Sequence, residues 1–312
     1  MQWPVRRRWL LLAALAAAIH GRSGAQPAWP RKPVRIIVAY PPGGVSDVVA
    51  RELAELLAAR LGVPVLVENR AGASGTLAME RVAVSPADGH VLGFAAATAV
   101  ALMAASGRRE PGLLPVTPVA GVMRTPVLVA GTPALRARTF AEMLSLARMR
   151  SGAIRWATTG VGTTGHNVLE RVRRASGAHL VHIPYKGGGQ QITDALGGHF
   201  EVLSTNVAPQ QLEAIQRGRL TALAVGAPAR LAVLPDVPTL AQLGFPDANL
   251  DSLFGLFAPP GTPAAVVQHL NREVAAALHD PGLRGALLAA NNTPFAGSAA
   301  DFLRQVQREG ER

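Results

Sequence analysis

The sequence predicts an α/β protein with two doubly wound units, each a parallel sheet covered by helices. Near the start, a β-branched run, a Pro/Gly loop, an apolar helical pattern and a second β-branched run predict a βαβ unit over residues 34–67. Between residues 154 and 226, strand and helix patterns alternate again. With 312 residues, 49% of them hydrophobic, the chain is long enough for two such units.

The elements of the first unit follow from local signals. The strand 34–39 ends at a Pro-Pro-Gly-Gly loop, and Ser46 or Asp47 is expected to cap the helix that follows. Apolar residues at three- and four-residue spacing form its buried face: Val49, Leu53, Leu56, Leu57 and Leu61. Gly62 is expected to end this helix. Near the end of the chain, another strand and Pro/Gly loop lead into a long helix with Pro263 near its first turn.

The first 25 residues are typical of a secretory signal peptide. Three arginines at 6–8 precede an apolar stretch at 9–19, which is too short to span a bilayer. Small residues at 23–25 predict cleavage after Ala25 and export to the periplasm; the alternative is an uncleaved anchor. The chain has no cysteine, which excludes disulfides, thiol catalysis and thiolate metal sites.

The charge favours small anionic ligands over nucleic acid. Beyond residue 25 the chain has 27 basic and 20 acidic residues, a net charge of +7. A modest positive field attracts anions. Aromatic residues make up only 4% of the chain, so no platform of interleaved basic and aromatic side chains is expected.

Two glycine-containing loops share the design of an anion site. Each follows a strand and leads into a helix N-terminus, where free amides and the helix dipole favour negative charge. Glycines let a ligand approach the backbone closely, and hydroxyls add neutral donors. The candidates in the first loop are Gly43, Gly44, Val45, Ser46 and Asp47, and those in the second are Thr159, Gly160, Gly162, Thr163, Thr164 and His166. Either loop alone fits an ordinary capped turn; two of them in separate units favour a ligand site between the units.

Other readings of these residues are weaker. The run GVGTTG at 160–165 matches a dinucleotide-binding pattern, but no acid stands between Glu170 and Asp194 to bind a ribose, so no NAD or other cofactor is expected. His179 and His182 are expected on opposite faces of a strand, which disfavours a metal site. The sequence has no nucleophile elbow and no zinc-protease motif, so an enzyme acting on an acidic substrate is the less favoured alternative.

Two further residues close a later predicted strand near the second loop. Tyr185 and Lys186 can reach a ligand held between the units. For Lys186 the alternatives are a solvated or ion-paired side chain and, more remotely, a Schiff base.

Several segments of the sequence together resemble a known protein family. The segments WPRKPVRIIVAYPPGGVSDVVARELAELL, LGVPVLVENRAGASG, PADGH, HIPYKGGGQQITDALGGH, LTALAVGAPARLAVLPDVPTLAQLG and LFGLFAPPGTPAAVVQHLNREV resemble the Bug family in order and across nearly the whole chain after residue 25. Members are extracytoplasmic solute-binding receptors of tripartite tricarboxylate transporters.

The resemblance implies a fold, a ligand and partners. It implies a type II periplasmic-binding-protein fold, with domain 1 over 26–122 plus 254–312 and domain 2 over 123–253, joined by crossing strands around a ligand cleft. It implies a monomer that binds a small carboxylate or related solute and passes it to membrane permease subunits. By motif match, Gly43 to Asp47 and Gly160 to Thr164 with His166 are the ligand loops.

The chain departs from the family pattern at several positions. Thr205 stands where the family usually has an aspartate and becomes a ligand candidate in its place, while Gly165 replaces a glutamine. Residues 95–99 carry fewer hydroxyls than usual, and the chain stops at Arg312, inside the expected final helix. Because of these departures, a degenerate receptor stays open as an alternative to a transport receptor. A sensor that feeds a signalling partner is a further alternative.

Overall fold

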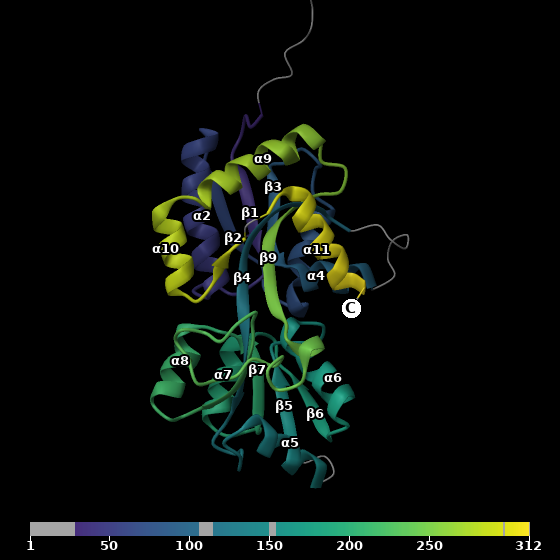
Figure 1. Cartoon of the computed structure of the whole chain (residues 1–312). Coiled ribbons are helices and arrows are strands. Elements are labelled where there is room, and N and C mark those ends of the chain that lie inside the picture. The colour runs from purple at the N-terminus through teal and green to yellow at the C-terminus, as the bar shows by residue number, and fades with distance from the viewer. Residues whose placement is uncertain (1–28, 106–114, 150–153, 296, 312) are drawn as a thin grey trace, which may run out of the picture. The chain divides into compact units, whose positions relative to one another are not determined.

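The computed structural model describes residues 29–105, 115–149, 154–295 and 297–311, and Lys32–Arg312 forms one compact unit (Figure 1). The predicted signal peptide, residues 1–25, lies outside the described residues. Among the helices that are described, none has both the length and the apolar character needed to cross a membrane.

Within the described residues of this unit, one mixed sheet of ten strands runs in two halves that share β4. The first half, with its helices, is here the first lobe: β1 Val34–Val38, α2 Val45–Leu61, β2 Val65–Asn69, η1 Ala73–Gly75, α3 Thr76–Ala83, β3 Val91–Ala96, α4 Ala97–Ala105, α9 Ala264–Ala277, α10 Pro281–Ala289, β10 Thr293–Pro294 and α11 Ala299–Glu311. The second half is the second lobe: α5 Phe140–Met149, β5 Ile154–Thr158, α6 Thr164–Ser176, β6 Leu180–Pro184, α7 Gly188–Leu196, β7 Val202–Asn206, α8 Pro209–Gln216, β8 Thr221–Gly226 and η2 Pro246–Ala248.

Two long strands connect the lobes. β4 (Thr117–Gly131) pairs with β9 (Asp251–Ala258) in the first lobe and with β7 and β8 in the second. The chain enters the second lobe through β4 and returns through β9. The predicted domain boundaries, 122/123 and 253/254, fall inside these strands, as crossing strands between two domains require; the boundaries themselves stay a prediction.

The first lobe contains the predicted βαβ unit. β1 pairs in parallel with β2 and with β3, and α2 connects β1 to β2, so this prediction is confirmed. The helices α2, α9 and α10 pack together, whereas α4 packs with α11 (Figure 1). Gly62 ends α2 in the left-handed conformation at φ 68°, which a glycine adopts without steric cost.

The prediction that Ser46 or Asp47 caps α2 is wrong. The helix begins at Val45, and its N-cap is Gly44, which makes no side-chain capping bond. Asp47 lies inside the first turn, and its carboxylate reaches back to accept the N–H of Gly43 at 2.9 Å. The cap lies two residues before Ser46 and three before Asp47, because Gly43 takes a positive φ of 79° directly after two prolines.

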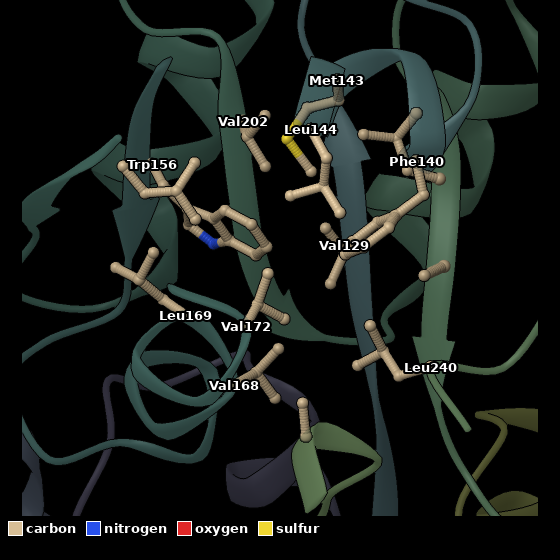
Figure 2. Close-up of a cluster of buried hydrophobic side chains, with 14 of the residues drawn as sticks. Val129, Phe140, Met143, Leu144, Trp156, Val168, Leu169, Val172, Val202 and Leu240 are labelled. Carbon is tan, nitrogen blue, oxygen red and sulfur yellow. The ribbon is translucent and has the colours of Figure 1, made fainter. Parts of the chain in front are cut away.

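The second lobe is built around a buried tryptophan. β5 pairs in parallel with β6 and β7, and its residue Trp156 is fully buried among side chains from α5, α6, β4 and β7 (Figure 2). The indole N–H donates to Ser204 Oγ at 2.9 Å, and that hydroxyl donates to the carbonyl of Gly165 at 2.8 Å. A Cβ on Gly165 would stand 2.9 Å from the Ser204 carbonyl oxygen, which explains the glycine there. This packing fixes α6, and the loop before it, against the sheet.

Candidate functional site

The first candidate loop, residues 41–47, presents unpaired amides at the start of α2. Gly43 has open space around it: nothing lies within 4 Å of the position its Cβ would take. The Gly43 N–H donates a hydrogen bond to the Asp47 carboxylate. Within the described part of the chain, no acceptor takes the N–H groups of Gly44, Val45 and Ser46. Three amides at a helix N-terminus therefore point to an anion-binding loop.

Asp47 supports this loop from beneath. Its side chain is 5% exposed and accepts from Gly43, from Arg51 Nε at 3.1 Å and from Asn69 Nδ2 at 2.7 Å. Burial would raise the pKa of Asp47, but the hydrogen bonds from Arg51, Gly43 and Asn69 outweigh burial and lower it. Asn69 also donates to the carbonyl of Tyr40 at 3.1 Å. Asp47 thus shapes the loop, and its charge is already compensated by protein groups.

The second candidate loop, residues 158–166, uses several of its amides internally. Thr163 caps α6 by accepting from His166 N–H, and its hydroxyl donates to the Gly160 carbonyl at 2.8 Å. Gly162 N–H donates to His166 Nδ1 at 3.0 Å, and Gly160 N–H to Thr158 Oγ1 at 3.2 Å. Among the described residues, the amides of Val161, Thr164 and Gly165 have no acceptor. This loop is preorganised by its own side chains and still offers donors.

The glycines of the second loop face the first lobe closely. A Cβ on Gly160 would stand 2.5 Å from Ser74 Oγ, and one on Gly162 would stand 2.9 Å from Leu102 Cδ1. Ser74 Oγ donates to the carbonyl of Val161 at 2.7 Å. The space left free by the missing side chains of Gly160 and Gly162 is therefore occupied by first-lobe side chains, Ser74 and Leu102.

Two histidines stack beneath the second loop. The rings of His166, on α6, and His182, on β6, lie 4.2 Å apart between centroids and 27° from parallel. His182 Nε2 is 2.8 Å from Thr158 Oγ1, and His166 Nε2 is 3.6 Å from Glu170. Burial, then the neighbouring His166, lowers the pKa of His182 to about 4. Burial also lowers the pKa of His166, although Glu170 opposes this. Both rings are neutral at pH 7.

The stack predicts that acid destabilises the protein. His182 takes a proton near pH 6.5 in the unfolded chain but only near pH 4 when folded, so stability falls as the pH drops through that window. Replacing His182 by glutamine should flatten the dependence, with a change of about 2–4 °C in the difference between the melting temperatures at pH 7.5 and pH 5. His279→Gln, at an exposed position after α9, is the control and should behave as wild type. An unchanged pH profile in His182→Gln would contradict the assignment.

The remaining candidates lie at different depths. The backbone of Tyr185 and the turn after it lie beside the second loop, because the Tyr185 carbonyl is 3.4 Å from where a Gly160 Cβ would stand. The Tyr185 hydroxyl donates to Asp194 at 2.8 Å; burial and this bond raise its pKa to about 12. Lys186 is exposed and has no ion-pair partner among the described residues. Thr205 is buried in β7, opposite Leu128 of β4.

Thr164 connects the second loop to a crossing strand. Its side chain is buried, and Ser252 Oγ of β9 lies 2.9 Å from its hydroxyl and 2.6 Å from Asn206 Oδ1. The first residue of α6 is therefore joined to the strand through which the chain returns to the first lobe. Local sequence patterns cannot reveal this contact, since 88 residues separate Thr164 from Ser252.

A cavity of about 390 Å³ lies where the lobes meet, beside the Ser74–Val161 bond. Its lining combines first-lobe residues of η1, α3 and α4 with Val161 of the second loop, and is mainly apolar near Leu102 and Met103. None of the predicted ligand-binding residues lines it. Val161, one of the second-loop residues whose amide has no acceptor, lines this cavity, whereas no residue of the first loop does. Within the described residues, no group of three or more histidine, aspartate or glutamate side chains could hold a metal ion.

Two α/β lobes joined by crossing strands, with loops at helix N-termini, define a periplasmic binding protein, and the predicted fold class is confirmed. The chain belongs to the tripartite tricarboxylate transporter family receptors, whose family model matches residues 49–312. The resemblance to the Bug family is likewise confirmed. Protein BugT of Bordetella pertussis is 35% identical over 269 residues, which cover 85% of this chain and 82% of that protein.

Solved structures agree with this assignment. R. palustris Rpa4515 with adipate is 31% identical, has a TM-score of 0.79, and the match covers 91% of this chain and 96% of that one. MatC (Rpa3494) from Rhodopseudomonas palustris with bound malate is 28% identical, with a TM-score of 0.79 and coverage of 91% and 98%. The chain is thus similar to two proteins whose structures contain small dicarboxylates, adipate and malate.

Proposed function

We propose that this chain captures a small carboxylate-bearing solute between its two lobes and delivers it to the membrane permease subunits of a tripartite transporter. It acts as a monomer in the periplasm after removal of residues 1–25, and it binds without chemical turnover. The observation that carries the proposal is the pair of helix N-termini, each of which leaves three amides without an acceptor among the described residues: those of Gly44, Val45 and Ser46, and those of Val161, Thr164 and Gly165. The adipate and malate held by its two solved relatives support a carboxylate ligand.

Neutral donors provide the anion selectivity in this proposal. The guanidinium of Arg51, on the helix after the first loop, is already bonded to Asp47 and Asn69. The amides of Gly44, Val45 and Ser46 then supply the first lobe's donors to the ligand. On the second lobe the donors come from the Thr159–Thr164 loop, with exposed Lys186 adding positive charge nearby. Helix N-terminal amides hold carboxylates and phosphates in this way without a paired cation.

Closure of the lobes couples binding to delivery. A ligand that contacts the unpaired amides of both loops stabilises only the arrangement in which the lobes are together. It therefore shifts the population toward that arrangement. In this proposal closure bends β4 and β9, the strands that connect the lobes, and the Ser252–Thr164 hydrogen bond joins the second loop to β9. The membrane partner would then recognise the loaded form by its lobe arrangement.

A thermal-shift screen tests the proposed ligand class. The protein from Gln26 onward is melted with malate, adipate and other small carboxylates, and with the diamides of the same acids as neutral controls. A true ligand at 100 times its dissociation constant stabilises the folded state by about 2.7 kcal/mol through mass action. The acids are expected to raise the melting temperature, and the diamides to leave it unchanged. Equal shifts for acids and diamides, or conversion of a bound acid to another compound, would exclude the proposal.

A further inference from the structure

The turn before α3 is held in an uncommon backbone conformation. Four successive residues have positive φ values: Gly72 at 133°, Ala73 at 45°, Ser74 at 56° and Gly75 at 95°. Two of them are not glycine, and residues with side chains rarely adopt this region unless their surroundings impose it. Strained backbone of this kind clusters at active sites, ligand clamps and switch regions. In this turn the Ser74 hydroxyl is directed at the carbonyl of Val161 in the second loop.

The surroundings of the turn fix its position. Gly75 is buried, and a Cβ there would lie 3.1 Å from the Ala99 Cβ and 3.3 Å from the Ala39 Cβ. The neighbouring Tyr40 hydroxyl accepts from the backbone N–H of Ala96 at 3.0 Å. Thr76 donates to the Ala73 carbonyl within the turn at 3.0 Å. The turn is therefore a rigid part of the first lobe, and Ser74 projects from it toward the second.

Ser74 makes a direct hydrogen bond between the lobes. Its hydroxyl donates to the carbonyl of Val161 at 2.7 Å, and it occupies the space that a side chain at Gly160 would need. Leu102 of α4 lies close to Gly162, one residue beyond Val161: its Cδ1 is 2.9 Å from the position a Gly162 Cβ would take. Two first-lobe side chains thus meet consecutive parts of the second loop, beside the proposed ligand donors.

We infer that Ser74 is a closure latch: it binds the second loop and not the ligand, and it thereby tightens the binding of every ligand by the same factor. The inference rests on the proposed function and deepens it. Contacts between the lobes that form only when the lobes are together raise the fraction of molecules in the binding-competent arrangement. The apparent dissociation constant equals the intrinsic dissociation constant divided by that fraction. This fraction does not depend on which solute is bound.

Affinity measurements on Ser74→Ala test the uniform factor. Loss of one hydrogen bond is expected to weaken malate and adipate binding alike, each by about 2- to 10-fold, through faster ligand release. Ser85→Ala is the matched control, because Ser85 donates to the Arg81 carbonyl at 2.8 Å inside the first lobe; it should keep wild-type affinity. An unchanged affinity in Ser74→Ala, or losses that differ by more than about 3-fold between the two acids, would overturn the latch.

A cross-link tests the contact without any ligand. A Cβ on Gly160 would lie 3.6 Å from the Ser74 Cβ, within the range of disulfide-bonded cysteines, and the chain has no cysteine of its own. Oxidation of the Ser74→Cys, Gly160→Cys double variant should give a species that migrates differently on a non-reducing gel, whereas Ser85→Cys with Gly160→Cys should not. The reduced variant is first checked for folding by circular dichroism, because Gly160 has a φ of 142°.

The two experiments separate two kinds of failure. Absence of the disulfide in folded, oxidised double variant would overturn the latch and leave the ligand proposal standing. Formation of the disulfide together with no stabilisation of the wild type by any carboxylate would retain the lobe contact and reject the proposed function. If the disulfide forms and carboxylates stabilise the wild type, the oxidised double variant loaded with malate is expected to release malate at least about 10-fold more slowly than the reduced double variant. Equal release rates would show that the contact does not restrain opening of the lobes.

Discussion

Replacing Gly162 by valine is expected to abolish ligand binding, with a loss of about 100-fold or more. Gly162 has a φ of 75°, which a β-branched residue adopts only with strain, and its Cβ would stand 2.9 Å from Leu102 Cδ1 of the first lobe. The valine would therefore hold the lobes apart and disturb the Gly162–His166 hydrogen bond that shapes the loop. Since a bridging ligand needs both sets of donors together, most of its contacts would be lost. Isothermal titration with malate or adipate measures the effect.

Gly177→Val separates this effect from backbone strain alone. Gly177 ends the same helix with a φ of 62°, and nothing lies within 4 Å of its Cβ position. Both variants should lose thermal stability from strain, but Gly177→Val should keep ligand affinity. Wild-type affinity in a folded Gly162→Val protein would show that the second loop does not take part in closure. Loss of binding in both variants would attribute the effect to α6 as a whole.

The fold could be predicted because its signals are local. The β-branched runs, the apolar face of α2 and the glycines that end helices, such as Gly62 and Gly177, act within a few residues of their own position. Parallel pairing then follows from strand–helix–strand order and chain handedness. The cap of α2 could not be predicted because Asp47 fits two local conformations equally well. It can be the N-cap residue, or it can lie in the first turn and accept a hydrogen bond from the residue before the N-cap.

The parts of the site that could not be predicted depend on contacts distant in sequence. Ser74 meets Val161 across 87 residues, and Ser252 meets Thr164 across 88. The stacking of His182 on His166 depends on how α6 packs over β6, which spacing along one strand does not reveal. The run of positive φ at residues 72–75 contains two non-glycine residues, so composition gives no warning of it. The loops themselves were predictable because strand–glycine–helix order already places amides at a helix N-terminus.

Replacing Asp47 by alanine is expected to destabilise the protein by about 2–3 kcal/mol and to weaken ligand binding. The carboxylate is buried and accepts from Gly43, Arg51 and Asn69, so its loss leaves three donors without their shared acceptor. Gly43 would then no longer be held in the turn that exposes the neighbouring amides. Urea unfolding measures the stability loss. Glu213→Ala is the control: Glu213 forms an i,i+4 pair with Arg217 of the same kind, but on the surface, and its loss should cost at most about 1 kcal/mol.

Asp47→Asn distinguishes the charge from the shape of this side chain. An amide oxygen in the place of Oδ2 can still accept from Gly43 and from Arg51 Nε, but the amide nitrogen in the place of Oδ1 repels Asn69 Nδ2 and Arg51 Nη2, so a stability loss smaller than that of alanine is expected at pH 7. The lowered pKa of Asp47 means that the wild type keeps its advantage above the ordinary value of 3.8 and loses it as the pH falls through the folded-state value. The difference between wild type and Asp47→Asn should therefore shrink in urea unfolding at acid pH. A constant difference across that range would show that hydrogen-bond geometry, and not the ionised carboxylate, holds the first loop in place.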